Sequence, residues 1–380
     1  MNHTEFMNHT KDNGTDRSET ESAITESAIL KIIESEVPDF RIYEYAIEDG
    51  SYLFYGNPIN DPKDMFRRLW VPISSIGYDI RMAYELGEYV LVISPVTRKK
   101  DRIWINVLLA LLTVITTMFV GSMMFGVDPF SNPAAILKGL PFTLAIMFVL
   151  GSHEMGHYIV ARKHGMKTSW PYFIPFPTIV GTMGAVIKHK GPIPNRKALF
   201  DVGVAGPIVG LIASIIVTVI GLSLTPLDTV IPDGSMFLKL SIPVLFDIIG
   251  YLVGGIGPET VMHPVAFAGW VGMLVTALNL MPAGQLDGGH MLRAMLGPKS
   301  AYVSAVVPFV LLSLSLFIYF VMKQNGGMWL FWGLIITLFA ATGHPEPLED
   351  SDYLGSSRIL LGVLVFVAGL LCVTLVPIQV

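Results

Sequence analysis

The sequence predicts an α-helical polytopic membrane protein with six to seven transmembrane helices, a membrane-embedded β-hairpin and a small cytoplasmic α+β domain at its N-terminus. The 380 residues are 52% hydrophobic and only 14% charged, with a mean hydropathy of +0.58, which is well above that of soluble domains. Several apolar stretches also reach the ~20 residues that a helix needs to cross a hydrocarbon core of ~30 Å. We expect crossings near residues 103–125, 135–161, 198–222, 264–282, 301–322 and 358–377, with a shorter and less clear one near 328–342.

The first 96 residues differ in character from the rest. Residues 1–24 are polar and repeat the string MNHT, so we expect a disordered tail. Residues 25–96 are expected to form a small soluble α+β domain. Apolar residues at helical spacing predict a helix over 25–36, Asp49-Gly50 predicts a two-residue hairpin turn, a helical piece follows near 61–70, and 78–95 has the pattern of a second hairpin. The remaining residues, 97–380, are expected to form the transmembrane domain.

Basic residues predict how the chain lies in the membrane. They gather before the first expected crossing, between the second and third, and after the fourth: Arg98, Lys99, Lys100, Arg102, Arg162, Lys163, Lys167, Lys188, Lys190, Arg196, Lys197, Arg293 and Lys299. Because cytoplasmic loops carry an excess of Lys and Arg, the N-terminal domain is expected in the cytoplasm and the 223–263 connection outside. The start of the sequence resembles neither a signal peptide nor a transit peptide, which favours a prokaryotic plasma membrane.

Composition excludes two further classes. The sequence has no stripe of basic residues that would indicate a nucleic-acid partner. The expected partners are therefore membrane lipid and a transmembrane protein substrate. Nothing in the sequence predicts the oligomeric state. The single cysteine, Cys372, lies in the last apolar stretch and allows neither an intrachain disulfide nor a thiolate metal cluster.

The string GSHEMGHYIV interrupts an apolar stretch with three polar side chains. His153 and His157 are four residues apart, so both imidazoles lie on one face of a helix, with Glu154 beside them. This H-E-x-x-H arrangement holds zinc through neutral imidazole nitrogens and supplies a carboxylate as general base. Ionisable groups within a crossing are costly, and metal binding offsets that cost. A cluster of hydrogen bonds between packed helices is the alternative.

A third protein ligand is required, and the sequence offers five candidates: Asp201, Glu259, His263, Asp287 and His290. Glu259 and His263 belong to the external side, whereas Asp201 and Asp287 belong to the same end as the two histidines. The stretch NLMPAGQLDGGHML contains Pro282 and several glycines, so we expect its backbone to be partly non-helical. Irregular backbone at membrane depth occurs within protein or beside a water-filled cavity, which favours Asp287.

Together these motifs resemble the site-2 protease family of intramembrane zinc metalloproteases. H-E-x-x-H at 153–157 is followed in a later crossing by N-x-x-P-x-x-x-x-D-G, which begins at Asn279 and contains Asp287. The longer strings PYFIPFPTIVGTMGAVI and PNRKALFDVGVAGPIVG are most similar to the archaeal, cyanobacterial and plastid branch. The resemblance covers roughly residues 100–360. The chain departs from some members in having no recognisable PDZ or CBS module.

The resemblance implies roles for five residues. His153, His157 and Asp287 correspond to the ligands of one Zn2+ per chain, and Glu154 to the catalytic acid and base. Asn279 corresponds to an asparagine that holds substrate or the developing oxyanion, with an interhelical hydrogen bond as the alternative. The implied activity is zinc-dependent hydrolysis of a peptide bond within or next to a transmembrane helix of a membrane-tethered substrate. Asp201 also matches a family position, which we expect to be structural.

Other polar and irregular segments carry weaker expectations. Residues 170–188 contain prolines and glycines among β-branched residues, which predicts a membrane-embedded hairpin that pairs with an unwound substrate, or else a short interfacial loop. We expect His164 and His189 to be solvated, and His290 to begin a helix.

Two rival functions use the same residues. A metal transporter would place ligands at several depths along a path, whereas this sequence concentrates them at one level. A non-proteolytic membrane scaffold would not need Glu154 or a complete ligand set, and this chain has both.

Overall fold

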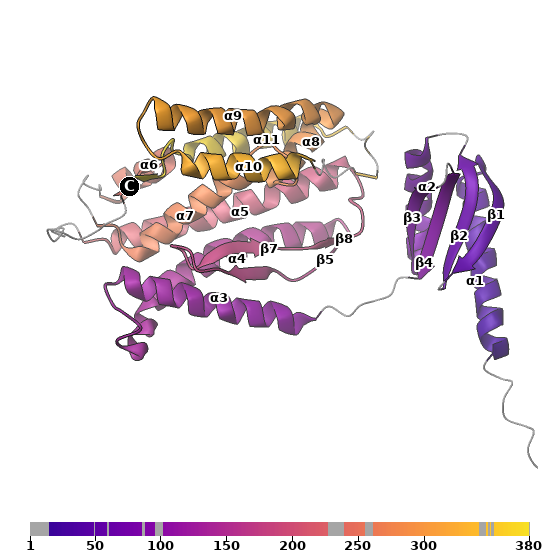
Figure 1. Cartoon of the computed structure of the whole chain (residues 1–380), viewed down its shortest axis with the longest axis horizontal. Coiled ribbons are helices and arrows are strands. Elements are labelled where there is room, and N and C mark those ends of the chain that lie inside the picture. Colours follow the sequence, from indigo (N-terminus) through magenta and orange to yellow (C-terminus); the bar gives the residue numbers. More distant parts are fainter. Residues whose placement is uncertain are drawn as a thin grey trace, which may run out of the picture. The chain divides into compact units, whose positions relative to one another are not determined.

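The computed structural model of the chain divides into two compact units, Met1–Lys100 and Asp101–Val380 (Figure 1). It describes residues 15–379 except for 49, 59–60, 86–87, 96–101, 227–238, 255–260, 342–346, 349 and 351–352. Each unit is considered by itself below.

The N-terminal unit is a four-stranded antiparallel sheet with two helices. Its elements are α1 (Thr15–Glu36), β1 (Phe40–Glu48), β2 (Ser51–Pro58), α2 (Pro62–Ser75), β3 (Tyr78–Glu85) and β4 (Glu88–Pro95). The sheet order is β1-β2-β4-β3, so the two predicted hairpins join through β2 and β4. Gly50 has a φ of 75°, the left-handed conformation that the predicted turn needs.

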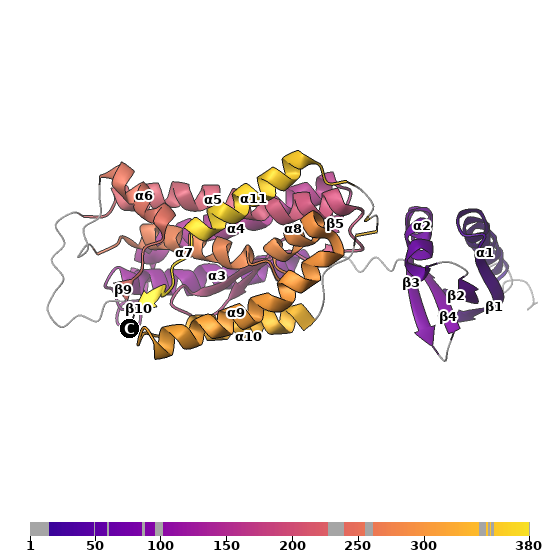
Figure 2. The same ribbon diagram turned by 90° about the horizontal axis from the view of Figure 1, so that it is seen from above.

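Both helices of this unit pack on one face of the sheet (Figure 2). Ile29 and Ile33 of α1 and Leu69 and Ile73 of α2 are buried against sheet residues that include Phe54. The apolar residues of the helices recur every three or four positions, whereas those of β2 alternate, so each element presents its apolar face to one shared core.

The helix α1 begins earlier than the sequence prediction allowed. It starts at Thr15, so residues 15–24, which we expected to be disordered, are helical here. Residues 1–14 of the expected tail lie outside the described residues. The physical reason is that adding turns to a helix already held by packing requires no new nucleus, and the Glu and Ala residues of this stretch favour helix.

The second unit consists mainly of helices that run roughly side by side (Figures 1 and 2). Its helices are α3 (Ile103–Met124), η1 (Pro133–Gly139), α4 (Leu140–Lys163), α5 (Arg196–Ser223), α6 (Val244–Val253), α7 (Pro264–Asn279), α8 (Asp287–Leu296), η2 (Gly297–Lys299), α9 (Ser300–Phe320), α10 (Gly327–Ala341) and α11 (Ser356–Leu371). Between α4 and α5, β5 (Lys167–Thr168) pairs with β8 (His189–Lys190), and β6 (Tyr172–Pro175) pairs with β7 (Thr182–Val186). Near the C-terminus, β9 (Lys239–Leu240) pairs with β10 (Ile378–Gln379).

Four helical stretches are long and apolar enough to cross a membrane: Ile103–Met124, Pro133–Lys163, Arg196–Ser223 and Asp287–Phe320. The stretches expected at 264–282, 328–342 and 358–377 are shorter apolar helices. The helix α7, for example, has 16 residues and is therefore about 24 Å long. The structure also adds α6, a ten-residue apolar helix within the 223–263 connection that the sequence analysis did not predict.

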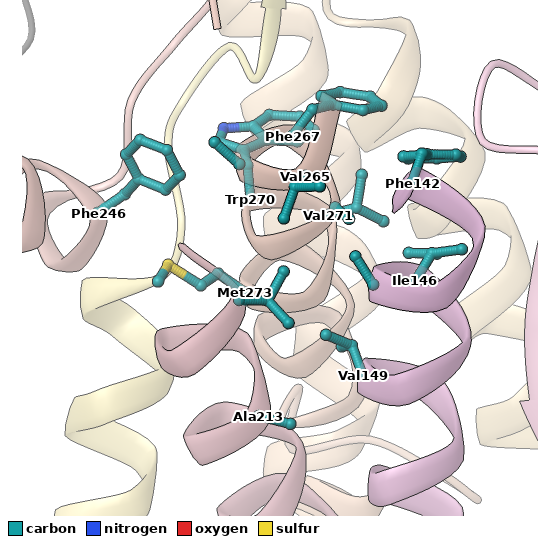
Figure 3. Packing of buried hydrophobic residues seen from close by; sticks show 14 of the residues in the cluster. Phe142, Ile146, Val149, Ala213, Phe246, Val265, Phe267, Trp270, Val271 and Met273 are labelled. Atoms are coloured by element: carbon teal, nitrogen blue, oxygen red, sulfur yellow. The ribbon is translucent and has the colours of Figure 1, made fainter. Parts of the chain in front are cut away.

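The short helix α7 packs against both α4 and α5, which also pack directly on each other. Figure 3 shows Phe142, Ile146 and Val149 of α4 directed toward the Val265–Met273 part of α7, with Phe246 of α6 nearby. Trp270 is buried, and its indole N–H donates to the Ser241 carbonyl. Protein on all sides explains why α7 is apolar around its whole circumference.

The outer helices expose large apolar side chains instead. On α9 these include Tyr302, Phe309 and Phe320, and on α3 they include Trp104 and Leu111. A soluble protein does not present apolar surfaces of this extent to water. Together with the four long apolar helices, these surfaces identify a helical membrane protein.

Candidate metal centre

The helix α4 carries the first two candidate ligands and the candidate acid and base. His153, Glu154 and His157 are all buried, with at most 8% of each residue exposed. The two imidazole rings lie 4.9 Å apart, centroid to centroid, because a spacing of four residues brings them onto one face of the helix.

Asp287 approaches these histidines from a distant part of the sequence. The helix α7 ends at Asn279, residues 280–286 are non-helical around Pro282, and α8 begins at Asp287 itself. The expectation of irregular backbone in this stretch is thus met. A carboxylate in the first turn of a helix is stabilised by the unpaired N–H groups of that turn.

The three side chains meet at one point. His153 Nε2 lies 3.2 Å from His157 Nε2 and 3.2 Å from Asp287 Oδ2, and His157 Nε2 lies 3.3 Å from Asp287 Oδ1. Zinc bonds of 2.0–2.1 Å in a tetrahedral site place neighbouring ligand atoms roughly 3.3–3.4 Å apart. Two imidazoles and a carboxylate also match the donor set of catalytic zinc sites. The residues therefore fit a zinc ion with one position left for water.

A contact to α5 sets the tautomer of His157. Its Nδ1 lies 2.8 Å from the Val202 carbonyl oxygen, which can only accept, so Nδ1 carries the proton and Nε2 keeps its lone pair. The neighbouring Gly206 makes room for this ring, because an added Cβ at Gly206 would overlap it. The short side chains of α5 thus allow α4 and α5 to approach each other closely.

The backbone N–H of Ile187 lies near the carboxylate of Glu154. Ile187 directly follows β7, so the segment between β7 and β8 reaches the candidate acid and base. A backbone donor of this kind has no residue-type signature, which is why the sequence analysis missed it.

Asn279 lies beside the same centre. Its amide Nδ2 is 3.3 Å from His153 Nε2. The last residue of α7 is thereby within reach of the ligand cluster, as its place in the motif suggested.

The other candidates for the third ligand are elsewhere. Asp201 forms two hydrogen bonds with Arg358 of α11, 2.7 and 2.9 Å long, and lies 3.1 Å from His164 Nε2. His263 accepts the Val265 N–H at the start of α7. His290 lies in the first turn of α8, as expected, and Glu259 is outside the described residues.

Two histidines differ from their predicted solvation. His164 approaches Asp201, as described above, because the end of α4 packs beside α5. His189 is partly buried, and this burial lowers its pKa. The pairing of β8 with β5 folds His189 inward opposite Thr168, an effect that local sequence does not predict.

Polar contacts also hold the far end of α8, the helix that begins with Asp287. Arg196 donates from Nε to the Ala294 carbonyl and from Nη2 to the Met295 carbonyl. Arg293 forms two hydrogen bonds with Asp350, 3.0 and 2.8 Å long. Cations at the last carbonyls of a helix satisfy acceptors that have no partner within the helix, so α8 is held at both ends.

Comparison with known proteins agrees with this geometry. Residues 141–321 match the family described as peptidase family M50. A probable zinc metalloprotease, chloroplastic EGY2 from Arabidopsis thaliana, is 30% identical over 256 residues, which is 64% of this chain and 43% of that protein. The chloroplastic EGY1 proteins of Oryza sativa subsp. japonica and A. thaliana are each 30% identical over 251 residues, covering 63% of this chain and 41% and 43% of the relatives.

The chain thus spans less than half the length of these relatives. No solved structure matches it. The family match contains H-E-x-x-H, Asn279 and Asp287, all the residues that meet at the candidate centre. Over residues 141–321, the helical unit of this chain is similar to peptidase family M50, the site-2 protease family.

Proposed function

We propose that this protein is a zinc-dependent intramembrane endopeptidase. The observation that carries the proposal is the triangle of His153 Nε2, His157 Nε2 and an Asp287 carboxylate, with sides of 3.2–3.3 Å, next to the buried carboxylate of Glu154. The names of the relatives, probable zinc metalloproteases, support the same chemistry.

His153, His157 and Asp287 would hold the ion. Zinc in such a site polarises the scissile carbonyl and lowers the pKa of water. The Val202 carbonyl holds the His157 ring with Nε2 directed at the centre.

Glu154 moves the protons. Its carboxylate accepts a proton from the attacking water and delivers it to the amide nitrogen of the leaving group. The Ile187 N–H, which lies near this carboxylate, is the backbone donor that would orient it. Asn279 has an amide N–H that turns toward the oxygen of the scissile carbonyl once His153 Nε2 is engaged by the ion.

The hairpin of β6 and β7 is proposed to lie within the membrane and to receive the substrate. Because β7 leads directly to Ile187, a peptide that pairs with β7 would pass the Glu154 carboxylate. Main-chain pairing would also replace the hydrogen bonds that a substrate helix loses when it unwinds.

The topology is likewise a proposal. We retain six to seven crossings, with residues 25–96 as a separate soluble domain on the side of the basic loops, which is the cytoplasm if the membrane is prokaryotic. The relatives named above are chloroplast proteins, so they do not support our expectation of a prokaryotic plasma membrane.

The test uses purified full-length protein and a transmembrane peptide substrate, with zinc content and cleavage measured in parallel. Wild type should hold about one zinc per chain and cleave. Glu154→Gln should keep the zinc and lose cleavage, whereas Asp287→Ala should lose both.

Asp201→Asn is the matched control. It also removes the charge of an aspartate, but this carboxylate lies on α5 and pairs with Arg358, not with the two histidines. It should keep its zinc. Cleavage that persists in Glu154→Gln would exclude the proposed mechanism, and zinc that persists in Asp287→Ala would exclude that residue as a ligand. Wild-type protein without zinc would leave the three side chains as a hydrogen-bond cluster between helices.

A further inference from the structure

The connection between α4 and α5 is unusually basic. Between Glu154 and Asp201 the sequence has seven Lys and Arg residues and no Asp or Glu: Arg162, Lys163, Lys167, Lys188, Lys190, Arg196 and Lys197. Arg196 is committed to the carbonyls of α8. Five of the others are exposed, and we call them the basic rim: Arg162, Lys163, Lys167, Lys188 and Lys190.

The fold brings these five cations together at one end of the helical unit. Arg162 and Lys163 occupy the last turn of α4, and β5 and β8 follow at the same end (Figure 1). In the β5–β8 ladder, Lys167 is directly opposite Lys190. Like charges in such a pair repel each other, so an anion bound between them would stabilise the ladder.

Aromatic side chains lie next to the rim. Trp170 stacks on Tyr158 with ring centroids 5.3 Å apart, and the Arg162 guanidinium carbon is 5.9 Å from the Tyr158 centroid. Trp170 is half exposed. Trp and Tyr prefer the level of the lipid headgroups, where one part of the ring is apolar and the other is wet.

Beside these rings, α3 offers an apolar surface. The Asn106 side chain donates to the carbonyls of Trp170 and Pro171, so α3 packs against the segment that follows Lys167 of the basic rim. Val107, the next residue of α3, and Leu111, one helical turn after Val107, are each about half exposed. An acyl chain can therefore run along α3 from a headgroup that contacts the basic rim.

We propose that the basic rim binds the headgroup of an anionic lipid in the leaflet on this side of the membrane. The ligand chemistry is a phosphate or sulfate attached to acyl chains. The positive charges of the basic rim complement the negative charge of the headgroup. The adjacent exposed apolar face of α3 can contact the acyl chains. This binding is independent of the proposed peptidase activity.

The experiment is native mass spectrometry of the full-length protein. The protein is held in a neutral detergent to which equal amounts of phosphatidylglycerol and phosphatidylcholine are added, and it is then released from the detergent in the spectrometer. Wild type should retain phosphatidylglycerol in preference to phosphatidylcholine. Lys167→Gln/Lys190→Gln should weaken that preference about 25-fold, since each cation near a membrane surface contributes about fivefold.

The matched control is Lys138→Gln/Lys323→Gln. It removes the same charge from two exposed lysines beyond the opposite ends of α4 and α9, and it should keep the wild-type preference. Lys167→Arg/Lys190→Arg should also keep it, which separates the loss of charge from a failure to fold.

Equal retention of the two lipids by wild type would overturn the proposal. So would a loss of preference in Lys138→Gln/Lys323→Gln as large as that in Lys167→Gln/Lys190→Gln. Millimolar inorganic phosphate distinguishes the source of the anion. A preference that survives phosphate supports a lipid, whereas its loss would show that the rim takes a free anion.

Discussion

His157 Nδ1 donates to the carbonyl of Val202, 2.8 Å away, across the contact between α4 and α5. This bond orients an imidazole of the candidate centre through the backbone of another helix. It requires α5 to approach α4 closely, and the glycines of α5 permit that. An added Cβ at Gly210 would lie 2.7 Å from His153 Nδ1, and one at Gly206 would overlap the His157 ring.

Gly206→Ala should therefore weaken metal binding without removing a ligand. The methyl group displaces the His157 ring and breaks its bond to Val202, so we expect a loss of about 10–100-fold in zinc affinity, as for other changes to groups that orient a ligand. Competition with a chelator of known affinity measures it.

Gly151→Ala is the control for this change. Gly151 lies in α4, the other helix of this contact, and the nearest heavy atom to an added Cβ is 3.6 Å away, an ordinary contact. Its zinc affinity should equal that of wild type. Equal losses in both variants would show that helix composition, and not the His157 contact, is responsible.

Ile187→Pro should reduce cleavage while zinc stays bound. Proline has no N–H, so the substitution removes the backbone donor that lies near the Glu154 carboxylate and that we propose orients it. A misplaced catalytic group costs about 100-fold in rate. The quantities to compare are kcat and zinc content. Ile187→Ala shortens the side chain but keeps the N–H, and it should retain most of the activity; if alanine were as damaging as proline, the Ile187 side chain would be the cause.

Asp201→Asn should destabilise the helical unit. The carboxylate forms two hydrogen bonds with Arg358 and lies near His164, so it links α4, α5 and α11. Asp201 and Arg358 are partly exposed, at 23% and 34% of their side chains. We therefore expect about 1–2 kcal/mol, less than for a fully buried pair. The melting temperature in detergent measures this, and an unchanged value would show that the pair contributes nothing.

Tyr43 makes the N-terminal unit sensitive to alkali. A hydrogen bond to the Glu88 carboxylate, with burial and the charge of Glu88 adding to it, raises the pKa of Tyr43 to about 12. Because the folded pKa is above that of a free tyrosine, ~10, the contribution to stability is fully present below pH ~10 and is lost as the pH rises through about 12.

NMR of ring-labelled tyrosine in the full chain follows this titration, and Tyr43→Phe assigns the signal. In Glu88→Ala the pKa of Tyr43 should fall toward 10, since both the hydrogen bond and the charge of Glu88 are removed. An unchanged pKa in that variant would exclude Glu88 as the cause.

Local patterns were sufficient for the elements whose signals are local. Asp49-Gly50 marks the first hairpin because only a left-handed turn closes two residues between strands, and Gly50 adopts it. His153 and His157 can share an ion because helical geometry places residues four apart on one face. The long apolar stretches predicted helices since an isolated backbone in lipid must satisfy its own hydrogen bonds.

The sequence by itself therefore determined the membrane class, the hairpins and the H-E-x-x-H helix, and through motif order it indicated Asp287. Only the tertiary structure decided which carboxylate meets the histidines, since Asp201 pairs with Arg358 and Asp287 approaches His153. Packing also decided that His164 and His189 are partly buried and that the Ile187 N–H lies near Glu154. Contacts between residues far apart in the chain depend on how helices and strands approach one another, and no local periodicity encodes that distance.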